Sequence, residues 1–132
     1  MKCCALPKNG ASGEVSALAK DEQTKVVPIV PCSDLDASQA FYEKLGFTLK
    51  SDWVHYGYRI LVDSHGSGIH LTRTEAGWLD PERNAHGIYL YTSAVEEIAA
   101  GLGLVVETKP WGMKEFAVSD PDGTLVRIGW SE

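Results

Sequence analysis

Short apolar runs alternate along this chain with stretches in which apolar residues recur at helical spacing. The first run, 26–31, contains two prolines, which predicts a strand at a sheet edge or one that crosses to another subunit. Ser33-Asp34 then predicts the N-cap of a helix, whose apolar residues continue to Leu45 and which Gly46 ends. Three further segments have the composition of strands: 47–53, 56–62 and 68–73.

The second half of the chain repeats this order. A strand-like run at 87–92 is followed by Ser93, which predicts the start of a second helix with an apolar stripe. Segment 105–108 again has the composition of a strand. The stretch 109–130 predicts a hairpin around Asp-Pro-Asp-Gly at 120–123. In that motif proline presets the second turn position, and glycine accepts a positive φ at the fourth.

Each half therefore has the order β-α-β-β-β. This repetition predicts an α+β fold in which two βαβββ modules, about 25–75 and 85–132, form curved mixed sheets. Because each half leaves an open sheet edge, we expect the halves to pair into one curved sheet. Residues 74–84 link the modules of this single domain, 25–132. Residues 1–24 predict an N-terminal extension that docks on the domain or on a partner subunit.

Composition and charge exclude several classes of function. The chain has 132 residues, of which 44% are hydrophobic and 23% charged, and these values indicate one globular domain. The net charge of −6 argues against nucleic acid as a partner. No apolar run is long enough to span a membrane or to follow Met1 as a secretory signal. The cysteines lack metal-site spacing and are typical of reduced thiols in a cytoplasmic protein: Cys3, Cys4 and Cys32.

Several short motifs together carry a family resemblance. They are Val27-Pro28-Ile29-Val30, the segment 33–38, Phe41-Tyr42, Leu45-Gly46-Phe47 and Asp120-Pro121-Asp122-Gly123. With these motifs, 25–132 resembles the vicinal oxygen chelate superfamily of glyoxalases, bleomycin-resistance proteins and extradiol dioxygenases. The Pro-Trp-Gly-Met-Lys-Glu-Phe run at 110–116 is most similar to the bleomycin-resistance branch. The resemblance implies paired βαβββ modules, each curling into a cup, and a homodimer with the cups at its interface.

The resemblance also implies where a metal ion would bind. Enzymes of the superfamily hold a divalent ion through His, Gln or Glu on inward-facing strands, and the matching positions here are Val27, His86 and Arg127. Valine has no ligating atom, and a guanidinium is a permanent cation that repels a metal. We therefore expect no metal, no cofactor and no catalytic residue. His70 alternates with apolar neighbours on its strand and is interpreted as a packed, hydrogen-bonded side chain.

What remains is a binding cup lined by aromatic rings. Trp111 matches the tryptophan of the drug-binding relatives, and its Pro-Gly corner predicts a ring held outside the strands. Tyr56 falls where those relatives have a second stacking aromatic, but it also fits a core or edge position of a strand. Trp78 could close over the groove or cover the core beneath its own loop. Arg127, if it points into the cup, would attract a carboxylate or phosphate, or would be neutralised by Glu115.

The leading hypothesis is metal-independent binding and sequestration of a small planar molecule, such as an aromatic antibiotic. A metal-dependent enzyme of the glyoxalase or dioxygenase type, using His86 and ligands elsewhere, is the alternative. The N-terminal extension suggests a third hypothesis, a ligand-sensing or partner-binding module. Trp53 and Trp130 lie in expected strands and are interpreted as structural.

Overall fold

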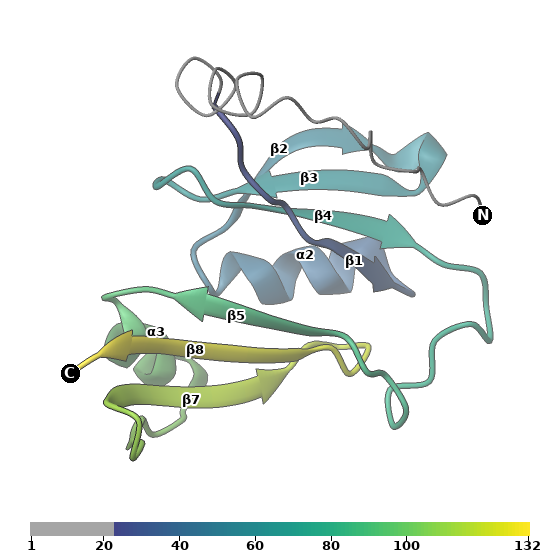
Figure 1. The fold of residues 1–132 in the computed structure, drawn as a ribbon. Coiled ribbons are helices and arrows are strands. Elements are labelled where there is room, and N and C mark those ends of the chain that lie inside the picture. The colour runs from purple at the N-terminus through teal and green to yellow at the C-terminus, as the bar shows by residue number, and fades with distance from the viewer. Residues whose placement is uncertain (1–22) are drawn as a thin grey trace, which may run out of the picture.

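The computed structural model describes residues 23–132 (Figure 1). The extension expected over 1–24 lies outside this range except for its last two residues. The first half contains β1 (Ile29–Cys32), α2 (Leu35–Glu43), β2 (Thr48–Trp53), the 3₁₀ turn η1 (Val54–Tyr56), β3 (Tyr58–Val62) and β4 (Gly68–Arg73). The second half contains β5 (Gly87–Tyr91), α3 (Val95–Leu102), β6 (Glu107–Thr108), β7 (Met113–Ser119) and β8 (Leu125–Ser131). The predicted α+β fold of two βαβββ modules is confirmed.

The two modules form separate sheets with the same topology. The described residues make one four-stranded sheet of order β1-β4-β3-β2 and another of order β5-β8-β7-β6. In each sheet the first and last strands pair in parallel, and the other pairs are antiparallel. The expectation of one continuous sheet is therefore wrong for the single chain. β1 is an edge strand, as predicted, and Pro31 removes an N–H donor that its outer edge would need to pair further.

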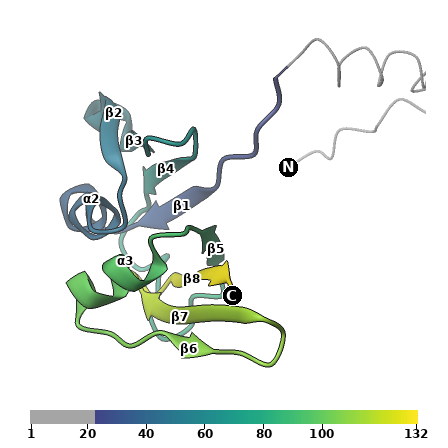
Figure 2. The same ribbon diagram turned by 90° about the vertical axis from the view of Figure 1, so that its left-hand side faces the viewer.

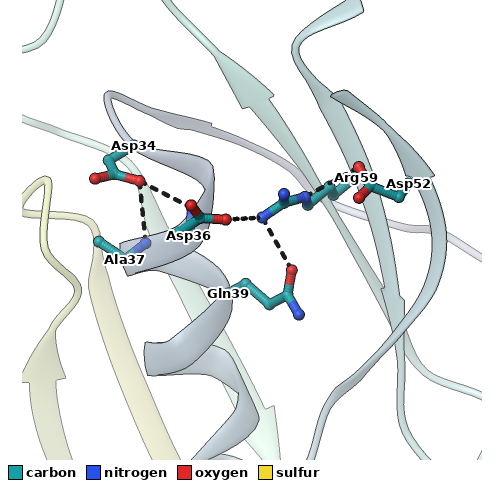
Figure 3. A network of polar contacts seen from close by, with 6 residues as sticks. All are labelled: Asp34, Asp36, Ala37, Gln39, Asp52 and Arg59. Carbon is teal, nitrogen blue, oxygen red and sulfur yellow. Dashed lines mark hydrogen bonds and ion pairs between the residues drawn. The ribbon is translucent and has the colours of Figure 1, made fainter. Parts of the chain in front are cut away.

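Short local motifs predicted most of the boundaries of the helices and strands. The carboxylate of Asp34 accepts hydrogen bonds from the amides of Asp36 and Ala37 at 2.9 and 3.2 Å, which confirms the predicted N-cap of α2 (Figure 3). The second cap was predicted wrongly. The N-cap position of α3 is Ala94, which provides no side-chain cap, and the Thr92 hydroxyl ahead of the helix accepts a hydrogen bond from the amide of Ala94 at 3.1 Å.

Two strand predictions also need correction. Tyr56 was expected within a strand but ends η1, and β3 begins two residues later. β6 covers two residues instead of the four expected at 105–108. Tyr56 belongs to the turn between β2 and β3, and β6 is an edge strand, where only one neighbouring strand holds the backbone extended.

The helices cover one face of each sheet. α2 packs on β2, β3 and β4, and α3 packs on β7 and β8 (Figure 2). Arg59 of β3 adds ion pairs to the contact between α2 and the first sheet. Its guanidinium lies 2.6 Å from Asp36 of α2 and 3.1 Å from Asp52 of β2 (Figure 3). No helix within 23–132 combines the length and apolarity needed to cross a bilayer.

One hydrophobic core serves both modules. Its buried residues come from both halves of the chain: Val30, Cys32, Leu35, Tyr42, Leu45, Phe47, Leu61, Ile69, Leu71, Val95, Ala99, Phe116, Val126 and Ile128. Burial raises the pKa of the Cys32 thiol to about 11, so this cysteine remains a protonated core residue at neutral pH. The helix-covered faces thus belong to the core, and the opposite sheet faces are left for a site.

Candidate ligand-binding site

The open face of the second sheet carries two stacked tyrosines. Along β5, Ile88 and Leu90 pack against the core, so the alternating Tyr89 and Tyr91 point to the opposite face. Their ring centroids are 4.4 Å apart. The sequence prediction missed both residues, although the order Ile-Tyr-Leu-Tyr already places the two tyrosines on one side of a strand.

A polar cluster lies beside these rings. The Tyr89 hydroxyl donates a hydrogen bond to Glu115 Oε2 at 2.6 Å, and Arg127 Nη1 lies 3.7 Å from Glu115 Oε1. The ion pair with Glu115, one of the alternatives for Arg127, is therefore present. Desolvation and the hydrogen bond to Glu115 raise the pKa of Tyr89 to about 12, so the phenol keeps its proton and continues to donate at neutral pH.

Gly129 of β8 allows Tyr89 to reach Glu115. Tyr89 lies on β5, Glu115 lies on β7, and β8 runs between these two strands. A Cβ at 129 would collide with the Tyr89 hydroxyl and would lie 2.9 Å from Glu115 Cβ. The tyrosine therefore crosses the central strand at the one position on its path that lacks a side chain.

A cavity of about 290 Å³ opens next to this cluster. Its wall combines apolar and charged side chains: Leu104, Val105, Glu107, Lys109, Glu115, Phe116, Ala117 and Arg127. Lys109 Nζ pairs with Glu107 Oε2 at 2.7 Å, and this hydrogen bond lowers the pKa of Glu107. The volume is close to the lower end of small-molecule sites, which begin at roughly 300 Å³.

The open face of the first sheet is also aromatic. The Tyr58 hydroxyl lies 2.6 Å from His70 Nδ1, which confirms that His70 is hydrogen-bonded. Trp53 is 55% exposed, and its ring centroid is 6.5 Å from that of Tyr56. Trp53 lies in a strand, as expected, but outside the hydrophobic core. Trp53 belongs to β2, which is an edge strand. It pairs with Tyr58 of β3, and both side chains lie on the sheet face away from α2.

The four predicted ligand-binding residues do not meet within one chain. Tyr56 is 82% exposed, Trp78 is 77% exposed and Trp111 is 64% exposed, so none of these rings fills the core of its own chain. Within residues 23–132, no ring contact, hydrogen bond or ion pair joins any two of the four predicted residues, the fourth of which is Arg127. β2, which precedes the turn of Tyr56, and β7, which follows that of Trp111, lie at opposite ends of the molecule in both views (Figures 1 and 2).

The residues at the expected metal positions do not fit a divalent ion. Val27 offers no ligand, and Arg127 is a cation already paired with Glu115. His86 is exposed, and its Nδ1 lies 2.8 Å from Asn84 Oδ1. Among the described residues, no three His, Cys, Asp or Glu side chains form a group that could hold a metal. The alternative of a metal site built around His86 therefore finds no ligand set.

Known proteins resemble this chain in sequence family and in fold. A family model described as Glyoxalase/Bleomycin resistance protein/Dioxygenase superfamily matches residues 25–128. Two similar solved structures are each 26% identical: a bleomycin-binding protein complexed with bleomycin (TM-score 0.69) and a bleomycin resistance determinant encoded on the transposon Tn5 (TM-score 0.70). Both alignments cover 83% of this chain, with 100% and 99% of the respective structures.

A third similar structure is TnmS3, an antibiotic binding protein from Streptomyces sp. CB03234. It is 25% identical with a TM-score of 0.64, and the alignment covers 84% of this chain and 98% of that one. No curated protein sequence matches the chain.

Proposed function

The chain belongs to the glyoxalase/bleomycin resistance protein/dioxygenase superfamily, and we propose that it binds and sequesters a small planar molecule in a cup at a homodimer interface, without a metal ion. The observation that carries this proposal is the exposure of three tryptophans that lie outside the core: Trp53, Trp78 and Trp111. Large aromatic rings contribute most to stability when they are buried. These exposed rings are therefore available to a ligand or to a second copy of the chain.

The similar structures support the class of ligand. Two are bleomycin-binding or bleomycin-resistance proteins and a third is an antibiotic binding protein, and all three align with nearly their whole length. A flat heteroaromatic antibiotic is thus the ligand class that we propose. Each stacking contact with such a ring is worth about 0.5–1.5 kcal/mol beyond the area that it buries.

The positions of the aromatic residues support the proposed homodimer. Tyr56 and Trp111 belong to opposite ends of one chain, so one chain cannot bring both to the same ligand. In a two-fold dimer the first sheet of one copy can face the second sheet of its partner, and this happens twice by symmetry. The open faces then become the two walls of a cup.

A fluorescence titration tests the proposal. Bleomycin and a panel of flat heteroaromatic compounds are added to the purified full chain, and tryptophan emission is followed. We expect saturable quenching by at least one compound, and we expect a chelator to leave it unchanged. Trp111→Ala should weaken the binding by roughly 2- to 13-fold, the equivalent of one lost stacking contact.

Trp130→Ala is the matched control, because Trp130 lies two residues after the buried Ile128 and therefore faces the helix side of β8, away from the proposed cup. It should leave the affinity unchanged. Absence of saturable quenching with every compound would overturn the proposal, and so would a stoichiometric divalent ion in the purified protein.

A further inference from the structure

The cavity beside Arg127 has a chemical character that narrows the ligand class. We propose that Arg127 makes the site selective for planar ligands that carry an anionic group, such as a carboxylate, next to their ring system. This inference rests on the proposed function, since it concerns the same ligand and the same cup.

The guanidinium of Arg127 retains unused donors. Its contact with Glu115 is an ion pair at 3.7 Å, too long for a hydrogen bond. Within residues 23–132 no hydrogen bond from its guanidinium to another side chain or to the backbone is found. Five N–H groups in a planar fork match the two oxygens of a carboxylate. The donors that line the cavity are therefore available to such a group.

The Glu115 carboxylate is far less exposed to a ligand than the Arg127 guanidinium. Its side chain is 4% exposed, whereas that of Arg127 is 51% exposed. One oxygen of Glu115 accepts the hydrogen bond from Tyr89, and the other faces Arg127. A ligand that enters from the open face thus meets the cation, and the carboxylate lies beneath it.

The remaining walls of the cavity suit the rest of such a ligand. Lys109 and Glu107 form an ion pair at 2.7 Å, so this pair adds no net charge to the cavity beside the half-exposed guanidinium of Arg127. Leu104, Val105 and Ala117 supply apolar surface for a ring. The cavity thus combines apolar surface for a ring with the guanidinium of Arg127 at one side.

Two probes with the same ring test the selectivity: 2-naphthoate, which is an anion, and 2-naphthamide, which is neutral. Their affinities for the full chain are measured by tryptophan quenching and by calorimetry. We expect the native protein to bind 2-naphthoate about tenfold or more tightly than 2-naphthamide, because a hydrogen bond to a charged group is worth about 1.5–3 kcal/mol. Equal affinities would overturn the inference.

Substitutions at the cluster then assign the effect. Arg127→Gln should remove the preference for 2-naphthoate and leave the affinity for 2-naphthamide within about twofold. Arg127→Lys keeps the positive charge but lacks the planar set of guanidinium donors, so it should retain part of the preference for 2-naphthoate. Glu115→Gln should keep or increase it, because the buried carboxylate is gone while an acceptor for Tyr89 remains. A preference that persists unchanged in Arg127→Gln would overturn the inference.

The same measurements separate this inference from the proposed function. If both probes bind equally and Trp111→Ala weakens both, the cup exists and the anionic selectivity is wrong. If neither probe nor any compound of the heteroaromatic panel binds, the proposed function fails and this inference fails with it. Thermal unfolding of each variant shows whether a lost preference reflects a lost fold.

Discussion

The Tyr42 hydroxyl donates a hydrogen bond to Asp120 Oδ2 at 2.7 Å, and this bond joins the helix of the first module to the hairpin turn of the second. The tyrosine is fully buried and Asp120 is 5% exposed. The other oxygen of Asp120 accepts hydrogen bonds at 2.9 Å from the amides of Asp122 and Thr124. One carboxylate thus shapes the turn and connects the modules.

Tyr42→Phe should lower the free energy of unfolding by about 1–3 kcal/mol, because it leaves a buried carboxylate oxygen without its donor. Denaturant unfolding measures the change. Tyr91→Phe is the matched control, since Tyr91 is exposed and its hydroxyl makes no hydrogen bond within 23–132; it should shift stability by less than about 0.5 kcal/mol. Equal stabilities of the two variants would show that the bond between the modules contributes nothing.

The raised pKa of Tyr89 makes stability fall at alkaline pH. The ordinary pKa is 10.0, and in the folded chain burial and Glu115 raise it to about 12. Between these values the unfolded chain has released the proton while the folded chain retains it, so the free energy of unfolding decreases as pH rises. Below pH 10 the contribution is complete, and above about 12 it no longer changes.

Tyr89→Phe should therefore flatten part of this decline. Denaturation of both proteins at a series of alkaline pH values measures the two slopes, and the comparison removes the parallel contribution of Tyr42, whose pKa is also raised, by burial and Asp120. Identical slopes would mean that Tyr89 titrates as an ordinary tyrosine.

Gly129→Ala should displace the Tyr89 side chain from Glu115, because the added methyl group would occupy the position of the hydroxyl. We expect a loss of roughly 1–3 kcal/mol of unfolding free energy and a pKa of Tyr89 nearer its ordinary value. Tyrosinate absorbance during a pH titration reports the second effect. Gly101→Ala in α3 is the control, since a Cβ there meets no atom within 4 Å; it should stabilise by up to about 1 kcal/mol.

The modules could be predicted from the sequence because their signals are local. Asp34 caps α2 through hydrogen bonds to residues two and three positions further on, and Asp-Pro-Asp-Gly at 120–123 closes a turn in which Gly123 has φ 86°. Whether the halves share one sheet or form two depends on strand pairing between distant parts of the chain. Pro31 in β1 indicated an edge strand, which does not pair with the other half. Ser93 is not the cap of α3, because the N-cap position falls one residue later, at Ala94.

The candidate site was less accessible to sequence reasoning, because it depends on which strand faces stay uncovered. Trp53 was interpreted only as a structural strand residue, since a strand pattern does not tell which side the helix covers. Tyr89 and Tyr91 alternate visibly, but only the packing of Ile88 and Leu90 on the core shows that the tyrosines face outward. The contact between Tyr89 and Glu115 requires Gly129 on the strand between them, which no local pattern indicates.

The proposed dimer makes a prediction that a site within one chain does not. Suppose that each cup combines the first sheet of one copy with the second sheet of its partner. A heterodimer of the Tyr56→Ala and Trp111→Ala variants then has one cup that has lost both rings and one cup that retains both. Mixing equal amounts of the two variants, with exchange of subunits, should restore native affinity to about a quarter of the sites, because half of the dimers are mixed.

Titration of the mixture with 2-naphthoate should therefore show a fraction of sites with native affinity, which neither variant shows alone. Sedimentation of the native protein should give the mass of two chains. If the rings instead met within one chain, every chain in the mixture would lack one of them, and no site of native affinity would appear. The titration thus separates a cup shared between copies from a groove within one copy, even before the natural ligand is identified.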